Sequence, residues 1–111
     1  MDKLNILWTT DNKDTVFYMI AMYAINSKRH NWWKEVNIII WGAGVKLAGN
    51  DTQIQSEIME MLHQGITIEA CKDCCDTFGV SGRLEKLGIN VRYMGQALTE
   101  YIKADEKILT I

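Results

Sequence analysis

The sequence of 111 residues predicts a three-layer α/β domain, an α/β/α sandwich, with a mainly parallel sheet. Five short, β-branched segments alternate with helical segments and are joined by short links, which is typical of parallel sheets. The first two strand segments, residues 4–8 and 36–41, are apolar runs without alternation, as expected for strands buried on both faces. No linker, repeat or low-complexity stretch interrupts the pattern, so residues 1–111 are expected to form one domain.

The first half of the chain contains two strands around one long helix. Residues 4–8 predict a buried strand, and the polar residues 9–12 after it can form a loop and a helix cap. Residues 16–25 are almost uninterruptedly apolar and rich in Met, long enough to favour a helix. The second strand, 36–41, is expected to close in a turn at Gly42-Ala43-Gly44.

The middle of the chain predicts a second helix and a third strand. Apolar residues at helical spacing indicate a helix over 54–62. Thr52 and Gln55 could form its capping box, and Gly65 is expected to end it. Residues 65–70 then form an apolar strand that leads into the cysteines.

The last third completes the alternation. A short helix carries the cysteines, and Ser81 can cap the next helix, which Gly88 ends. Residues 89–93 predict the fourth strand, apolar residues over 98–102 a last helix, and residues 107–111 the fifth strand.

Composition excludes several classes of function. The chain is 48% hydrophobic and 23% charged, and its formal charge is −2 without a basic block, so nucleic-acid binding is not expected. No apolar stretch is long enough to cross a bilayer, and the start of the chain lacks the layout of a secretory signal. Three cysteines, an odd number gathered in one place, favour a reducing, cytoplasmic setting.

The three cysteines, Cys71, Cys74 and Cys75, lie within five positions. Cys71 is placed where the third strand should end and a helix begin. Amide hydrogens and the positive end of a helix dipole favour thiolate over thiol. Lys72 adds to this effect and the neighbouring carboxylates oppose it, so we expect a modest depression of the Cys71 pKa.

Four loops are expected to meet at the carboxyl edge of the sheet, where open α/β sheets bind ligands. They span residues 9–12, 41–46, 71–75 and 93–96, and the first is the expected neighbour of Cys71 because strand one is usually central. The candidate binding residues in these loops are Thr9, Thr10, Asp11, Gly42, Gly44, Lys46 and Tyr93. Helix capping and a tight turn are the ordinary alternatives for most of them.

The ordered pattern resembles the small DsrE/DsrF-like proteins of sulfur relay over nearly the whole chain. The matching segments are residues 4–8, Ile39-Ile40-Trp41-Gly42-Ala43-Gly44 with Leu47, residues 65–71, Phe78-Gly79-Val80, Leu87-Gly88-Ile89 and Tyr93-Met94-Gly95. The resemblance implies a five-stranded α/β/α sandwich that assembles into dimers, trimers or hexamers. It also implies that Cys71 accepts sulfane sulfur as a persulfide and passes it on. Relay cysteines of that family are not generally followed by further thiols such as Cys74 and Cys75.

Three functions remain open. The first is a sulfur carrier with sulfurtransferase-like activity, in which Cys71 exchanges sulfur with donor and acceptor proteins. The second is a thiol redox or sensing protein that uses the Cys71-x-x-Cys74 spacing, with Cys74 as the resolving thiol. The third is a noncatalytic binding or assembly subunit of the same fold.

No cofactor or metal is expected. The three cysteines and His63 have the composition of a zinc site, but adjacent cysteines diverge by about 100° on a helix.

Self-association is expected through residues 16–25. A helix on a sheet needs only an apolar stripe, whereas this segment is apolar around most of its circumference. We therefore expect a homo-oligomer.

Overall fold

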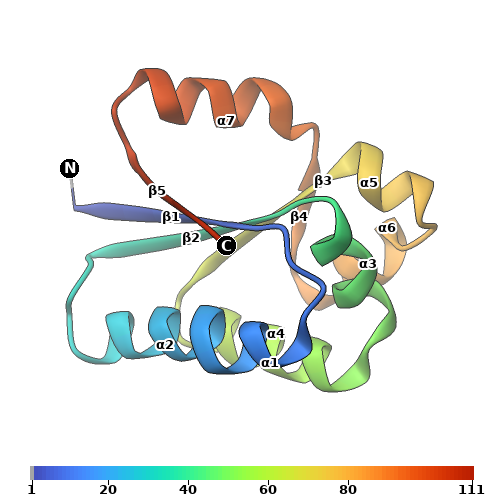
Figure 1. Cartoon of the computed structure of the whole chain (residues 1–111), viewed down its shortest axis with the longest axis horizontal. Helices are drawn as coiled ribbons and strands as arrows, with labels where there is room; N and C mark the ends of the chain where they lie inside the picture. Colours follow the sequence, from blue (N-terminus) through green and yellow to red (C-terminus); the bar gives the residue numbers. More distant parts are fainter. Residues whose placement is uncertain (1) are drawn as a thin grey trace.

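The computed structural model describes residues 2–111 and confirms the predicted fold class (Figure 1). A single five-stranded sheet has the order β4-β3-β2-β1-β5, and every pairing is parallel. The strands are β1 (Lys3–Trp8), β2 (Glu35–Ile40), β3 (Thr67–Cys71), β4 (Asn90–Arg92) and β5 (Lys107–Thr110).

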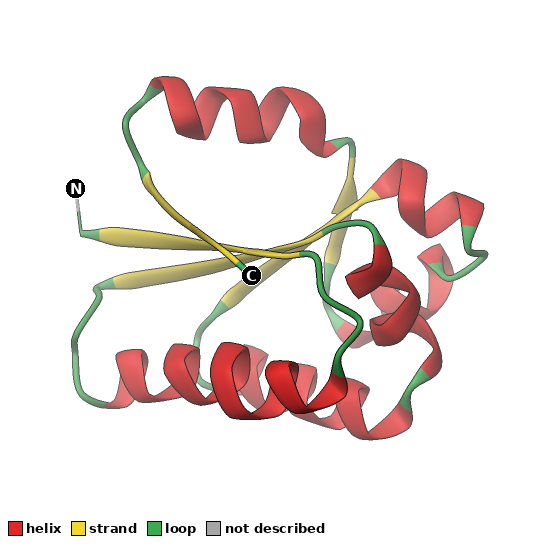
Figure 2. Cartoon of the chain, in the orientation of Figure 1, coloured by secondary structure: helices red, strands yellow, loops and turns green. Residues whose placement is uncertain are grey.

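Helices cover the two faces unequally (Figures 1 and 2). The helical segments are α1 (Lys13–Thr15), η1 (Val16–Ala21), α2 (Met22–Arg29), α3 (Ala43–Asn50), α4 (Thr52–His63), α5 (Lys72–Thr77), α6 (Ser81–Leu87) and α7 (Met94–Lys103). The continuous helix from α1 to α2 lies with α4 beneath one face, and α7 stands by itself over the other. The helices α3, α5 and α6 gather toward the carboxyl ends of the strands.

The apolar core follows this division. The larger cluster joins side chains such as Ile6, Trp8 and Ile38 to the helices of the first face. A smaller cluster under α7 consists of Ile39, Cys71, Met94 and Ala97, all buried. Successive side chains of a strand point to opposite faces, so Cys71 faces α7 while its neighbour Ala70 belongs to the larger core.

The expected loop over 41–46 is wrong, because residues 43–50 form α3. Gly44 and Lys46 are therefore helical. Gly44, Val45 and Ala48 are buried at helical spacing, and a Cβ on Gly44 would lie 2.9 Å from the Trp8 indole. Close packing has overridden the low helix propensity of glycine.

Three helix boundaries also differ from the expectation. Asp51, not Thr52, caps α4 by accepting a hydrogen bond from the amide of Ile54 at 2.9 Å. Ser81 is the first residue of α6 and donates to Asp76 at 2.6 Å, so it does not cap the helix. The helix expected over 16–25 extends from Lys13 to Arg29 and has a π-helical middle segment.

The sheet order places β2 at the centre, contrary to the expectation for strand one. The neighbours of β3 are β2 and β4. Consequently, the loop after β1 is two strands away from Cys71. No helix within residues 2–111 combines the length and apolarity needed to traverse a bilayer.

Candidate functional site

Cys71 ends β3 and occupies the N-cap position of α5. Its backbone is extended, with φ −64° and ψ 116°, and the chain turns directly into the helix. The side chain is 4% exposed and packs in the cluster formed with Ile39, Met94 and Ala97. The thiol thus lies at the predicted edge of the sheet but beneath the first turns of α7.

The expected depression of the Cys71 pKa is wrong, because burial raises it. The backbone amides of Cys74 and Asp73 donate toward the sulfur and oppose this rise, whereas the adjacent Cys74 thiol adds to it. The amides at the start of α5 thus favour the thiolate as expected, although the Cys71 side chain makes no cap hydrogen bond. Desolvation under α7 outweighs them.

The other two thiols have different environments. Cys74 is half-buried and packs against both core clusters, including the one that contains Cys71. Cys75 is fully buried in the larger core, where burial raises its pKa to about 11. The structure thereby distinguishes a pair, Cys71 with Cys74, from a third thiol that packs on the opposite side. Within residues 2–111, no three His, Cys, Asp or Glu side chains are grouped as metal ligands would be.

Residues from two of the predicted loops flank Cys71, although the predicted loop over 93–96 is wrong beyond Tyr93, because α7 already begins at Met94. Trp41, which follows β2, packs against the cluster that contains Cys71. Tyr93 follows β4, whose Arg92 is the register partner of Cys71, and Lys72 places its Nζ atom 5.8 Å from the Tyr93 ring. Tyr93 is exposed, so this part of the predicted site is open to solvent.

The remaining predicted binding residues do not converge on Cys71. Thr9 donates from Oγ1 to the carbonyl of Ile111, and the Thr10 hydroxyl accepts from the Asn12 amide. Both hold the loop after β1, in which Asp11 is exposed. Lys46 is exposed on α3.

Gly42 precedes α3 with φ at 61°, a conformation that glycine adopts without strain. The tight turn is sufficient to explain this glycine.

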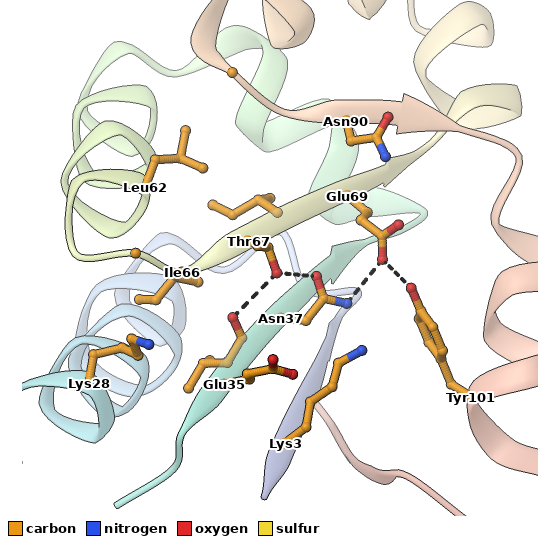
Figure 3. Close-up of a pocket in the computed structure, with 14 residues that line it drawn as sticks. Lys3, Lys28, Glu35, Asn37, Leu62, Ile66, Thr67, Glu69, Asn90 and Tyr101 are labelled. Atoms are coloured by element: carbon orange, nitrogen blue, oxygen red, sulfur yellow. Dashed lines mark hydrogen bonds between the residues drawn. The ribbon is translucent and has the colours of Figure 1, made fainter. Parts of the chain in front are cut away.

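A buried polar network on the strands next to Cys71 was not predicted from the sequence; Figure 3 shows its members Asn37, Glu69 and Tyr101. Glu69, two residues before Cys71 on the same face, is 7% exposed. Its Oε1 accepts hydrogen bonds from Tyr101 of α7 at 2.7 Å and from Asn37 of β2 at 3.0 Å. Its Oε2 accepts from Arg92 Nε at 2.5 Å, and the Arg92 guanidinium also donates to the Tyr101 hydroxyl at 3.0 Å.

The network continues across the sheet. Asn37 donates to Asn5 Oδ1 at 3.1 Å, and Asn5 donates to Glu106 at 2.9 Å. Glu106 also pairs with Lys3 at 3.1 Å. One signal in the sequence could have revealed the network, since Asn5, Asn37 and Glu69 are polar residues flanked on both sides by apolar residues in three strands. The register of the paired strands brings these three side chains into contact, and the sequence does not give this register.

The network shifts the titration of its members. Burial, followed by the hydrogen bond to Glu69, raises the pKa of Tyr101 to about 12. Burial lowers the pKa of Arg92, but the hydrogen bond to Glu69 and the charge of Glu69 raise it. The pKa of Arg92 is therefore above its usual value. Both groups therefore keep their protons near neutral pH, and the Tyr101 hydroxyl remains a donor to Glu69.

A cavity of about 640 Å³ opens beside this network, near the amino ends of β2 and β3 (Figure 3). Its polar lining includes Asn37, Thr67, Glu69, Asn90 and Tyr101. Several of these groups satisfy one another, as in the 2.8 Å bond from Thr67 to Asn37 Oδ1. The cavity thus gives solvent access to the network that joins α7 to the sheet.

The fold and the position of Cys71 and Cys74 define an α/β/α sandwich protein with cysteines at the carboxyl edge of its sheet. No family model matches the chain, and no curated protein matches it. A protein of unknown function from Bacteroides thetaiotaomicron, BT1422, is 69% identical, with a TM-score of 0.97. The match covers 99% of this chain and 95% of that one. The chain belongs to the same family as BT1422.

Two further solved structures share the fold at low sequence identity. YchN from E. coli is 18% identical with a TM-score of 0.77. MTH1491 from Methanobacterium thermoautotrophicum, a protein of unknown function, is 15% identical with a TM-score of 0.80. Each match covers 100% of both chains. YchN and MTH1491 have the DsrE/DsrF-like fold, and these matches support the same fold for this chain.

Proposed function

We propose that the chain is a DsrE-like sulfur carrier that holds a persulfide on Cys71. The observation that carries this proposal is the position of Cys71 at the N-cap of α5, where backbone amides favour the thiolate, in one cluster with the more accessible Cys74. The amides stabilise the thiolate that must attack a donor. The burial of Cys71 would protect the bound sulfur from bulk solvent and from unrelated thiols.

The transfer is a thiol exchange. The Cys71 thiolate attacks the outer sulfur of a donor persulfide, the sulfur–sulfur bond of the donor breaks, and the donor leaves as a thiolate. Cys71 then carries the persulfide until the thiolate of an acceptor protein attacks the same outer sulfur. No net oxidation occurs in either step, so the protein needs no redox cofactor for the reaction.

A second function is favoured by the packing of Cys74 against the cluster that contains Cys71. A small disulfide such as oxidised glutathione could oxidise the pair, with the two protein thiols forming a disulfide and the oxidant leaving as two thiols. In that case Cys74, being more exposed, would form the mixed disulfide first and Cys71 would resolve it, which reverses the roles expected from the sequence.

Mass spectrometry separates these functions. Trypsin cleavage at Lys72 places Cys71 on one peptide and Cys74 with Cys75 on the next, which ends at Arg83. After incubation with a small-molecule persulfide and rapid alkylation, the relay predicts one added sulfur atom on the Cys71 peptide. A disulfide between Cys71 and Cys74 would indicate redox chemistry. An unchanged protein would exclude both and leave a binding role.

The matched variants are Cys71→Ser and Cys75→Ser. The first should lose the added sulfur while its circular dichroism spectrum stays the same. The second removes a thiol that packs in the opposite core and should keep the added sulfur. Persistence of the sulfur in Cys71→Ser would contradict the assignment to Cys71.

Self-association and a cytoplasmic location are part of the proposal. Tyr18 is 70% exposed and Met22 49% exposed on the helix formed by α1, η1 and α2, which supports a second copy of the chain as the group that covers them. Light scattering at micromolar concentration should give at least the mass of a dimer, and Tyr18→Glu should lower it. The free thiols support a reducing compartment.

A further inference from the structure

We infer that Tyr101, Glu69 and Arg92 are positioning residues that hold α7 over Cys71 and thereby set the access of reagents to its thiol. The inference rests on the proposed function, because it concerns the regulation of the same sulfur-carrying thiol. It addresses a specific conflict, since a carrier must exchange its sulfur with other proteins and Cys71 is 4% exposed.

The helix α7 supplies four of the side chains in the cluster around Cys71, and Trp41 and Cys74 also pack against this cluster. Met94 and Ala97 of α7 are buried against Cys71, and Leu98 and Tyr101 are partly buried in the same cluster. The other side chains of α7 are exposed. Figure 1 shows α7 set apart from the helices that pack beneath the opposite face. The attachment of α7 to the sheet therefore depends on a short apolar stripe and on its polar contacts.

The main polar contact is the one that Tyr101 makes with the network. Its hydroxyl donates to the buried carboxylate of Glu69 at 2.7 Å and accepts from Arg92 at 3.0 Å. Arg92 is fixed in turn by its ion pair with Glu69. Glu69 and Arg92 belong to β3 and β4, so Tyr101 joins the carboxyl half of α7 to two adjacent strands. A hydrogen bond to a charged group is stronger than one between neutral groups.

The network is placed to act on Cys71. Glu69 precedes Cys71 by two residues and faces the same side of the sheet, and Arg92 is the register partner of Cys71 on β4. When α7 moves away, the bond from Tyr101 to Glu69 must break and the apolar cover over Cys71 must open. The cavity beside Glu69 and Tyr101 provides room for water to replace that bond. Local opening of this kind costs less than global unfolding.

The test is the alkylation rate of each thiol in the Cys74→Ser background, followed on the two tryptic peptides. Tyr101→Phe removes one hydroxyl and keeps the ring. We expect it to accelerate alkylation of Cys71 about tenfold, because opening no longer breaks a bond to a charged group. Cys75 is an internal control, since it is fully buried in the opposite core. Global unfolding would accelerate both thiols, whereas movement of α7 accelerates Cys71 alone.

Two further variants sharpen the test. Glu69→Gln keeps the acceptor oxygen but removes its charge, so it should accelerate Cys71 by less than Tyr101→Phe does. Thr99→Ala removes a hydrogen bond within α7, to the carbonyl of Gly95, and leaves the sheet contacts intact, so it should not change the rate. An unchanged Cys71 rate in Tyr101→Phe, or an equal rise at Cys75, would overturn the inference. If Cys71 takes up no sulfur but its alkylation responds as expected, the proposed function fails and the role of α7 stands.

Discussion

Cys71 and Arg92 are register partners on β3 and β4, so the candidate sulfur-carrying thiol stands directly beside the residue that binds Glu69. The apolar cover over Cys71 and the polar network under Tyr101 thus occupy adjacent parts of one sheet face. The thiol of Cys71 and the residues that attach α7 to the sheet are therefore neighbours, so movement of α7 changes the surroundings of the thiol.

The three thiols should react in a fixed order. We expect iodoacetamide at pH 8 to modify Cys74 first, Cys71 second and Cys75 last. Cys74 is partly exposed, Cys71 lies under one helix, and burial holds the pKa of Cys75 at about 11. Fragmentation of the tryptic peptides gives the rate at each position. Faster reaction of Cys75 than of Cys71 would contradict the described packing of α5.

The elevated pKa of Tyr101 predicts a loss of stability in alkaline solution. The phenol has a pKa of about 12 in the folded chain and about 10 when unfolded. Its contribution is therefore complete below pH 10 and decreases as the pH rises toward 12, because the unfolded chain releases its proton first. Urea unfolding should show the stability difference between the wild type and Tyr101→Phe shrinking over this interval. A difference independent of pH would refute the raised pKa.

Removal of the Glu69 carboxylate should destabilise the fold strongly. Glu69→Ala leaves Arg92, Tyr101 and Asn37 without their common acceptor, and we expect a loss of about 3 kcal/mol in the free energy of unfolding. Arg92→Ala should cost less, because Arg92 is more exposed and Glu69 keeps two donors. Equal losses in the two variants, measured by urea denaturation, would argue against Glu69 as the centre of the network.

Substitution of Gly44 tests whether this glycine is required for close packing against Trp8, and not for binding a ligand. A Cβ at this position would lie 2.9 Å from the Trp8 indole, whose Nε1 is held by the carbonyl of Thr10 at 2.8 Å. Gly44→Ala should therefore lower the free energy of unfolding by about 1–3 kcal/mol. The matched control is Gly82→Ala in α6, where no atom lies within 4 Å of the added Cβ. Thermal denaturation should show a lower midpoint for the first variant and no loss for the second.

Much of the fold could be predicted from local pattern. The apolar runs at 4–8 and 36–41 become β1 and β2, and Gly88 ends α6 with φ at 104°, as a left-handed glycine does. The position of Cys71 at the junction of β3 and α5 was also predictable, since strand and helix periodicities change there. The helix α3 was missed because its glycines have low helix propensity, and only contact with Trp8 and the core explains them.

By itself, the sequence determined the order of the strands and of every helix except α3, the parallel α/β class and the location of the thiols at a strand end. These features depend on residue type and spacing along the chain. The tertiary structure decided which residues surround Cys71. The strand order brought β2 and β4, not β1, beside β3, and the register gathered Asn5, Asn37 and Glu69 beneath Tyr101. It also decided the Cys71 pKa, since desolvation by α7 outweighs the amides that the sequence placed near the sulfur.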